Sequence, residues 1–262
     1  SLSQIKKAME IIPSKNIIYS VRNHEGLSQV HKYNLWDWPL ELGQSPSGYP
    51  SVISLHERRE LEINHLKVES KVESVEQAID RLETSGKKAQ YLKLAIEIFD
   101  FHELEVADKW RKQNPERNQF LPRSQNGRWS WYRCHQKGQM KINFIREGIG
   151  SAMDQPTLFE WLSAFPQSYR FAAVLGDPIH HSYTPIEHLD FFHQRGLAVH
   201  RIQISANEMA NGGFEFLKSM GLSYAAVTSP LKISAFQLSQ SRSPMANELK
   251  AANTLFVAPN EV

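Results

Sequence analysis

The chain has 262 residues and a formal net charge of +2, with 11 histidines counted as neutral. Its basic residues are dispersed, which argues against nucleic acid as a partner, because a phosphate-binding face needs clustered lysine and arginine. The single cysteine, Cys134, excludes an internal disulfide framework and a cysteine-based metal cluster, and we predict no metal site. No apolar run approaches the roughly 20 residues that span a bilayer, and no signal-peptide pattern opens the chain. We therefore expect a cytoplasmic protein without membrane contact.

Residues 1–165 alternate strand-like and helix-like patterns after a first helix at 2–12. The predicted strands lie at 16–22, 35–42, 51–57, 91–98, 118–122 and 141–147, and the clearest helices lie at 74–88 and 101–114. Such alternation predicts parallel strands joined by helical crossovers. We therefore expect a partial or complete (β/α) barrel, although a complete eight-stranded barrel typically needs about 250 residues.

A domain boundary is expected near 163–170, and residues 170–262 are predicted to form a second, smaller α/β domain. Its predicted strands lie at 171–176, 198–204, 224–229 and 253–258, and its predicted helices at 185–195, 207–220 and 231–239. The two halves share no internal repeat. The fold class is therefore α/β, a barrel region over 1–165 followed by a separate domain.

Lys93 stands inside the apolar run "YLKLAIEI", where burial of an ammonium group is costly unless it is paired or loses its proton. One interpretation is a strand lysine that reaches the rim of the sheet. The other is an amine that attacks a carbonyl group and forms a Schiff base. His56 lies in the preceding predicted strand, near its carboxyl end, where a parallel barrel builds its site, and is either a proton shuttle or a solvated loop histidine. Arg22 ends another predicted strand and could bind a carboxylate.

The motifs "ISLHER", "YLKLAI" and "GSAMDQPTLFEWL" resemble the second half of type I 3-dehydroquinate dehydratase, a (β/α)8 barrel family. The resemblance implies that Lys93 is the Schiff-base lysine and His56 the general acid and base. The further residues that it implies in the substrate site are Arg22, Glu25, Ser151 and Gln155.

This chain departs from the dehydratase pattern in three places. The position of the family's carboxylate-binding arginine holds Trp131, and Arg133 could replace it only if the loop shifts. Met153 and Asp154 replace a Pro-Gly pair, and the added carboxylate would repel an anionic substrate. The family's first two strands have no counterpart. These departures predict weak or absent dehydratase activity for the chain alone.

The stretch "FAAVLGDPIHHSYTP" at 171–185 reads as an apolar strand that ends in a turn. The hydroxyls of Ser182 and Thr184 could face one small polar ligand, or they could only cap the helix that starts near Pro185. The residues of this stretch alone leave both interpretations open.

Three ordered motifs resemble the substrate-binding domain of shikimate dehydrogenase, namely "GDPIHHSYTP", "AVTSPLK" and "AANTL". The resemblance implies that Ser182 and Thr184 receive the shikimate carboxylate, with Thr228 nearby. It implies that Lys232 is catalytic and that Asn253 binds the ring hydroxyls. Ala226 stands where the family has asparagine, so one amide ligand is missing.

The sequence contains no G-x-G-x-x-G loop of the kind that binds a dinucleotide after a strand. We therefore expect no cofactor in this chain, and NADP only if a cofactor domain exists beyond residue 262. The order of the two regions resembles the fused dehydroquinate dehydratase–shikimate dehydrogenase enzymes of aromatic amino acid biosynthesis. The expected partner is a small molecule, which is 3-dehydroquinate, dehydroshikimate or shikimate, and the sequence is compatible with an oligomer.

Three hypotheses follow from these patterns. The first is an enzyme of the shikimate pathway, a Schiff-base 3-dehydroquinate dehydratase joined to a shikimate dehydrogenase substrate-binding domain. The second is a non-catalytic or reduced relative that binds shikimate-like ligands. The third is an unrelated sugar-phosphate (β/α) barrel enzyme. Lys93 and His56 favour the first hypothesis, whereas Trp131 favours the second.

Overall fold

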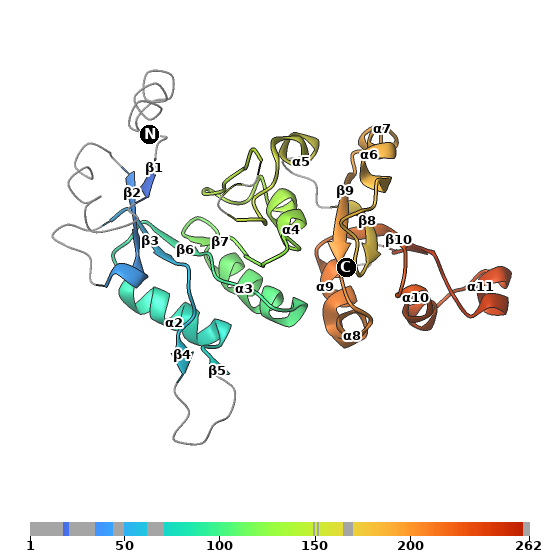
Figure 1. The fold of residues 1–262 in the computed structure, drawn as a ribbon, viewed down its shortest axis with the longest axis horizontal. Coiled ribbons are helices and arrows are strands. Elements are labelled where there is room, and N and C mark those ends of the chain that lie inside the picture. Colours follow the sequence, from blue (N-terminus) through green and yellow to red (C-terminus); the bar gives the residue numbers. More distant parts are fainter. Residues whose placement is uncertain are drawn as a thin grey trace. The chain divides into compact units, whose positions relative to one another are not determined.

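A computed structural model of the protein describes residues 18–20, 35–43, 50–61, 71–148, 150, 152–164 and 170–258. The chain divides into two compact units, and helix α3 (Phe101–Gln113) contributes residues to both. The first unit comprises residues 1–97 with 106–121, and the second comprises 98–105 with 122–262. Figure 1 labels their elements. The boundary predicted near 163–170 falls inside the second unit and stays a prediction.

The first unit contains a five-stranded parallel sheet with the order β1-β2-β3-β6-β7. Its strands are β1 (Ile18–Ser20), β2 (Leu35–Pro39), β3 (Val52–Leu55), β6 (Tyr91–Leu94) and β7 (Asn118–Phe120). Five predicted strands are thus confirmed in shorter form, and so is the parallel α/β class. A closed barrel is not confirmed, because the described strands form a sheet with β1 and β7 at its ends.

Helix α2 (Val75–Ser85) covers one face of this sheet and begins at a capping box formed by Ser74 and Gln77. Its buried stripe repeats at helical spacing and consists of Val75, Ala78, Ile79 and Leu82. Gly86 ends the helix beside Ile53 and Leu92, and a side chain at this glycine would collide with Leu92. Because side chains alternate along a strand, the opposite face carries Ser54, Lys93 and their neighbours.

Several short elements of the first unit have no counterpart among the predictions. Strands β4 (Glu60–Leu61) and β5 (Lys71–Val72) pair antiparallel, and a 3₁₀ turn, η3 (Leu40–Leu42), follows β2. The turn places Glu41 near the residues that follow β3. The sequence pattern did not predict that this turn brings Glu41 to the candidate site.

The second unit contains a four-stranded sheet with the order β11-β10-β8-β9. Its strands are β8 (Phe171–Gly176), β9 (Ala198–Gln203), β10 (Leu222–Val227) and β11 (Thr254–Phe256), of which β11 runs antiparallel to its neighbour. Strand β8 lies between β9 and β10, is parallel to both, and is buried along its whole length. All four strands predicted for this region are confirmed.

Short helices surround this sheet, and several of them replace longer predicted ones. They are α4 (Ser130–His135), α5 (Leu158–Ser163), α6 (Thr184–Glu187), α7 (Leu189–His193), α8 (Ala206–Glu208), the π-turn η4 (Met209–Gly213), α9 (Phe214–Ser219), α10 (Lys232–Leu238) and α11 (Pro244–Leu249). The predicted helix at 185–195 is the pair α6 and α7. The predicted helix at 207–220 is broken where Gly212 adopts a positive φ of 98°.

The strand predicted at 141–147 is wrong. The described structure has only one isolated bridge there, between Arg146 and Thr157. The Asn143 side chain accepts hydrogen bonds from the Phe144 backbone N–H at 2.9 Å and from the Arg133 guanidinium at 3.0 Å. Such local side-chain bonds compete with a strand ladder. They fix Arg133 as a structural residue of this segment.

An aromatic cluster forms the core of the second unit on the sheet face that α4 and α9 cover. Phe101 lies edge-on to Trp129 at 5.2 Å and stacks on Trp131 at 6.4 Å, measured between ring centroids. Phe171 of β8 lies 6.1 Å from Trp131, and Phe216 of α9 lies 6.3 Å from Phe101. Large aromatic side chains contribute most of the apolar area that a core buries.

Asp154 holds the loop at 124–129 in place. Its carboxylate accepts hydrogen bonds from the backbone N–H and the hydroxyl of Ser124 and from the backbone N–H of Trp129. Burial raises the pKa of Asp154, although these hydrogen bonds act in the opposite direction. The expectation that this carboxylate repels a substrate therefore lacks support, because the group is fully buried and serves the loop.

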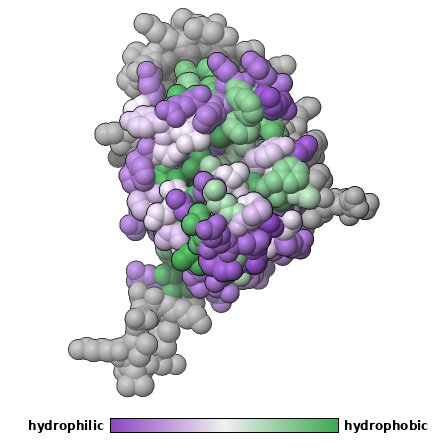
Figure 2. Space-filling model, turned by 90° about the vertical axis from the view of Figure 1, so that its right-hand side faces the viewer, coloured by the Kyte–Doolittle hydropathy of each residue, from purple (hydrophilic) through white to green (hydrophobic). Residues whose placement is uncertain are grey.

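Figure 2 shows hydrophobic areas interspersed with hydrophilic ones on one side of the molecule. The most exposed large apolar side chains of the second unit include Met245, Leu249 and Phe256, each at least 65% exposed. None of the described helices combines the length and the apolar character that a membrane span requires.

The role of Asp154 predicts a large cost for its removal. Asp154→Ala should lower the free energy of unfolding by about 2–4 kcal/mol, because the buried Trp129 N–H and the half-buried Ser124 N–H lose their acceptor. Ser124→Ala removes one donor to Asp154 and one of the two acceptors of the Arg128 N–H, and should cost about 1 kcal/mol. Urea unfolding followed by circular dichroism measures both. Equal destabilisation by the two variants would show that Asp154 does not hold the loop.

Candidate functional site

Lys93 is almost fully buried on the polar face of the first sheet, at 2% exposure, and forms an ion pair with Asp37 of β2. Lys93 pairs in register with Ser54 of β3 and Gln119 of β7, so these side chains share its face. All four of these polar residues are buried. Asp37 was not among the predicted site residues, although a carboxylate inside the apolar run "LWDWPLEL" indicates a buried charge that needs a partner.

His56 directly follows β3 and, by alternation, lies on the same face as Ser54 and Lys93. The carboxylate of Glu41 accepts the backbone N–H groups of His56 at 2.6 Å and Glu57 at 3.0 Å. Its other oxygen lies 3.5 Å from Nδ1 of His56. Burial alone would raise the pKa of Glu41, but the hydrogen bonds with His56 and Glu57 outweigh it and lower the pKa to about 2. Glu41 is therefore an ionised partner of His56.

The other residues predicted for the dehydratase-like site fall into two groups. Arg22, Glu25 and Ser151 lie outside the described residues. Gln155 belongs to the second unit, where its backbone carbonyl accepts the Arg146 Nε–H at 2.9 Å. The described structure thus places Lys93 on β6 and His56 directly after the neighbouring β3, and all six assignments stay predictions.

The residues predicted for the shikimate dehydrogenase-like site lie at one edge of the second sheet. Ser182 and Thr184 follow the carboxyl end of β8, and Thr228 and Lys232 follow the carboxyl end of β10. Asn253 directly precedes β11, which runs antiparallel and therefore starts at the same edge. Ligands of open α/β sheets commonly bind beyond the carboxyl ends of the strands.

Backbone hydrogen bonds join the segments that carry these residues. Thr228 donates its N–H to the Leu175 carbonyl at 2.9 Å, which ties the end of β10 to β8. Asn253 accepts the Val227 N–H at 2.8 Å. Lys232 accepts the N–H of Ala252 at 2.9 Å, so the start of α10 is fixed to the segment before β11. Backbone hydrogen bonds therefore connect the ends of β8 and β10, the start of α10 and the segment before β11 into one frame.

The side chains at this edge differ in exposure. Ser182, Thr184 and Thr228 are half-buried, whereas Lys232 and Asn253 are exposed. The Ser182 hydroxyl accepts the Thr184 backbone N–H at 3.4 Å, a long contact that leaves most of its bonding capacity available. The N-cap residue of α6 is Tyr183, whose side chain makes no cap bond, and the Ser182 hydroxyl binds the N–H of the first helix residue, Thr184. The helix-cap interpretation and the ligand interpretation of these hydroxyls therefore both stay predictions.

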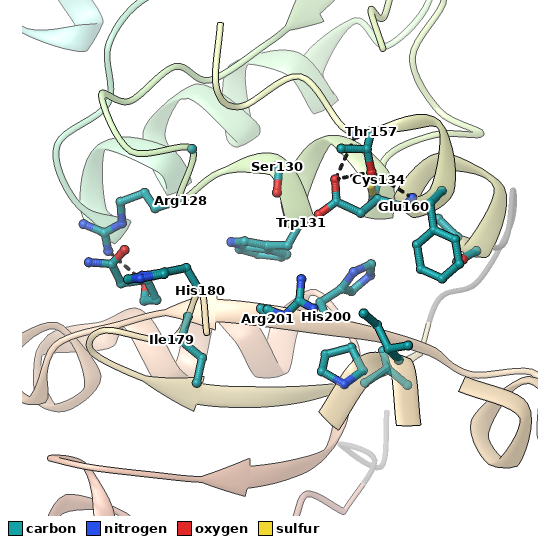
Figure 3. A pocket seen from close by; sticks show the side chains of 18 of the residues that line it. Arg128, Ser130, Trp131, Cys134, Thr157, Glu160, Ile179, His180, His200 and Arg201 are labelled. Carbon is teal, nitrogen blue, oxygen red and sulfur yellow. Dashed lines mark hydrogen bonds between the residues drawn. The ribbon is translucent and has the colours of Figure 1, made fainter. Parts of the chain in front are cut away.

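A cavity of about 430 Å³ lies elsewhere in the second unit, between the segment 126–164 and the region around β9 and α6 (Figure 3). Trp131 reaches toward β9, and His200 and Arg201 lie opposite it. His200 packs against His135, with ring centroids 6.0 Å apart. Burial, together with His135, lowers the pKa of His200 to about 3, so the imidazole is neutral near pH 7. Sequence reasoning did not identify this cavity.

Within the described ranges, no group of three or more histidine, cysteine, aspartate or glutamate side chains is arranged to hold a metal ion. Cys134 is buried, and burial raises the pKa of its thiol well above the usual range. The thiol is therefore protonated and unreactive.

Comparison with known proteins relates the second unit to a family. Residues 174–255 match the shikimate dehydrogenase substrate binding domain. The shikimate dehydrogenase (NADP(+)) of Xanthomonas campestris is 42% identical over 84 residues, which cover 32% of this chain and 30% of that protein. The shikimate dehydrogenase (NADP(+)) of Bacillus mycoides is 32% identical over 83 residues, which cover 31% of this chain and 30% of that protein.

A solved structure is also similar. The dehydroquinate dehydratase and shikimate dehydrogenase of S. pombe AroM aligns with 98% of this chain and 53% of its own, at 17% identity and a TM-score of 0.41. The chain spans about 30% of the length of the two curated relatives. Residues 174–255 are thus similar to the substrate-binding part of shikimate dehydrogenases.

The buried ion pair of the first unit can be tested through stability. Asp37→Leu leaves the Lys93 ammonium buried without its carboxylate and should cost about 3–5 kcal/mol of unfolding free energy. The double variant Asp37→Leu with Lys93→Met removes both charges and should recover most of that loss. Denaturant titration of the wild type, the two single variants Asp37→Leu and Lys93→Met, and the double variant measures the coupling. Simple additivity of the two single substitutions would contradict a direct pair.

The buried His200 predicts a pH dependence of stability. Its folded pKa lies below the unfolded value of about 6.5, so the unfolded chain takes up the proton first as the pH falls. The contribution of His200 is fully present above pH 6.5 and should decline toward pH 3 by up to about 1.4 kcal/mol per pH unit. His200→Phe should flatten this decline, whereas His102→Phe, at an exposed position, should leave it unchanged. Thermal unfolding between pH 4 and 7 compares them, and parallel curves for all three proteins would refute the assignment.

Proposed function

We propose that residues 170–258 bind shikimate or dehydroshikimate and that the chain acts in the shikimate pathway. One observation carries the proposal. The residues of three motifs that resemble the family lie together at the carboxyl edge of the second sheet, within the segment that matches the substrate binding domain. In this proposal Ser182 and Thr184 donate hydrogen bonds to the ligand carboxylate, with Thr228 beside them.

Lys232 and Asn253 take the remaining roles in this proposal. Lys232 lies near the hydroxyl group that shikimate dehydrogenases oxidise, and Asn253 binds the ring hydroxyls. Both are exposed beside the frame that joins β10 to β11, and exposure leaves their polar atoms accessible to a ligand. We propose ligand binding and not hydride transfer for this segment, because the sequence holds no glycine-rich dinucleotide loop.

A second candidate function, 3-dehydroquinate dehydratase activity, is favoured by the buried Lys93 on the face that His56 also shares. In this proposal the Lys93 amine passes a proton to Asp37 and attacks the C3 ketone of 3-dehydroquinate, and water leaves as the imine forms. His56 removes the C2 proton and returns it to the departing C1 hydroxyl, which leaves as water. Hydrolysis of the imine then releases dehydroshikimate and restores the lysine.

Ligand binding by the second unit can be measured by calorimetry. Shikimate should bind with a dissociation constant on the order of 1 mM, about −4 kcal/mol, because Ala226 supplies no amide ligand. The double variant Ser182→Ala with Thr184→Ala should bind no measurable shikimate, because the carboxylate loses both hydroxyl donors. Ser219→Ala, a serine of α9 whose hydroxyl bonds to the Phe216 carbonyl, is the matched control. Undiminished binding by the double variant would contradict the proposed site, and binding of NADP without shikimate would contradict the proposed function.

The Schiff base can be trapped chemically. Incubation with 3-dehydroquinate and borohydride, followed by peptide mass mapping, should label Lys93 and no other lysine. Lys93→Arg keeps a positive charge beside Asp37 and should abolish the label. Lys141→Arg should leave it intact. A label on another lysine, or dehydratase turnover without any label, would refute the assignment.

A further inference from the structure

The cavity of the second unit is of a size suited to a small molecule, and none of the residues assigned to the shikimate site lines it. Its volume of about 430 Å³ falls within the roughly 300–1,000 Å³ of typical ligand pockets. Two walls define it, one formed by α4 and the segments around it, the other by β9 and the residues after β8 (Figure 3). Three arginines line the cavity, Arg128, Arg146 and Arg201, against a single carboxylate, Glu160.

Among the arginines that line the cavity, Arg201 has both terminal nitrogens available to a ligand. Arg128 pairs with Glu208 at 2.8 Å, and Arg146 donates to the backbone carbonyls of Gln155 and Gly148. Arg201 uses Nε to donate to the Ser182 carbonyl at 2.6 Å, and among the described residues its two terminal nitrogens have no hydrogen-bond partner. A guanidinium with two such nitrogens matches the two oxygens of a carboxylate.

Three polar atoms of residues that line the cavity lack partners within the described structure. One is Nε of Arg128, and the others are Nε1 of Trp131 and Nε2 of His200, on side chains that are only 2% and 7% exposed. Buried polar atoms without a hydrogen bond are costly and rare in folded proteins, so each such atom calls for an explanation. The Nε1 atom of Trp131 is a fixed N–H donor, and the Nε2 atom of His200 belongs to a neutral imidazole ring.

The cavity also offers aromatic surface. Trp131 lies on one wall, and Phe159 of α5, which is 54% exposed, lies on the same side of the cavity. Indole and phenyl faces bind planar ligands by stacking or by edge contacts. Cationic charge, spare donors and aromatic surface together favour a planar anion over a sugar phosphate or a neutral ligand.

We propose that this cavity binds a small aromatic carboxylate, whose carboxylate pairs with Arg201 and whose ring packs against Trp131. The site is separate from the carboxyl edge where we place shikimate. The two sites share one link, because the Arg201 Nε–H holds the carbonyl of Ser182.

Benzoate is the probe that tests this site, by calorimetry and by saturation-transfer NMR on the full chain. The wild-type protein should bind it, and Arg201→Gln should weaken binding about 10- to 100-fold, because a charge-assisted contact is lost. Arg195→Gln is the matched control, since Arg195, which follows α7, lies outside the cavity lining. If Arg201→Gln fails to fold, Trp131→Phe serves instead and should weaken binding about 2- to 10-fold through loss of the indole N–H.

The outcomes separate this proposal from the proposed function. Ser182→Ala with Thr184→Ala should leave benzoate binding unchanged, and shikimate should not displace benzoate. The proposal would be overturned if the wild-type protein bound no benzoate at benzoate concentrations up to 10-fold the shikimate dissociation constant. It would also be overturned if Arg201→Gln bound benzoate as well as the wild type, or if shikimate displaced benzoate. Loss of shikimate binding alone would overturn only the proposed function.

Discussion

Gly176 at the end of β8 is the constraint on which the candidate shikimate site depends. A side chain at this position would collide with the methyl group of Thr228 and come close to Ile179. The bare backbone lets the end of β10 approach β8 closely enough for the Thr228 N–H to reach the Leu175 carbonyl. The segments that carry Ser182 and Thr228 meet beside this contact, and the Val227–Asn253 backbone bond adds the segment of Asn253. A larger residue here would separate the hydroxyls that we assign to one carboxylate.

The first unit depends on a different interaction, the buried ion pair between Lys93 and Asp37. Transfer of two charges into the interior costs several kcal/mol for each ion, and their attraction offsets this only with good geometry. Replacement of the two charged side chains by apolar side chains of similar volume would therefore leave the free energy of unfolding equal or higher. The polar face that also holds Ser54 and Gln119 thus fits a chemical role better than a structural one, and Glu41 fixes His56 at the end of the neighbouring strand.

Much of the architecture follows from local pattern. The apolar strand "FAAVLG" and the capping box at Ser74 and Gln77 identify β8 and α2 without any knowledge of tertiary contacts. The strand predicted at 141–147 fails because the Asn143 side chain binds the backbone there, a contact that apolar periodicity does not reveal. The interior helix break at Gly212 likewise interrupts an otherwise helical pattern.

The candidate sites were predictable only where one motif carries the residue. Lys93 and Ser182 stand out in their own segments, whereas Asp37 and Glu41 become partners only through the order and register of the strands. The cavity beside Trp131 and Arg201 joins segments 70 residues apart, which no single motif connects.

The central claim, a shikimate site at the carboxyl edge of the β8–β10 sheet, is tested most directly by a crystal structure of the full chain with shikimate. The account predicts the carboxylate within hydrogen-bond distance of the Ser182 and Thr184 hydroxyls, and a carboxylate found on Arg201 in the cavity would contradict it.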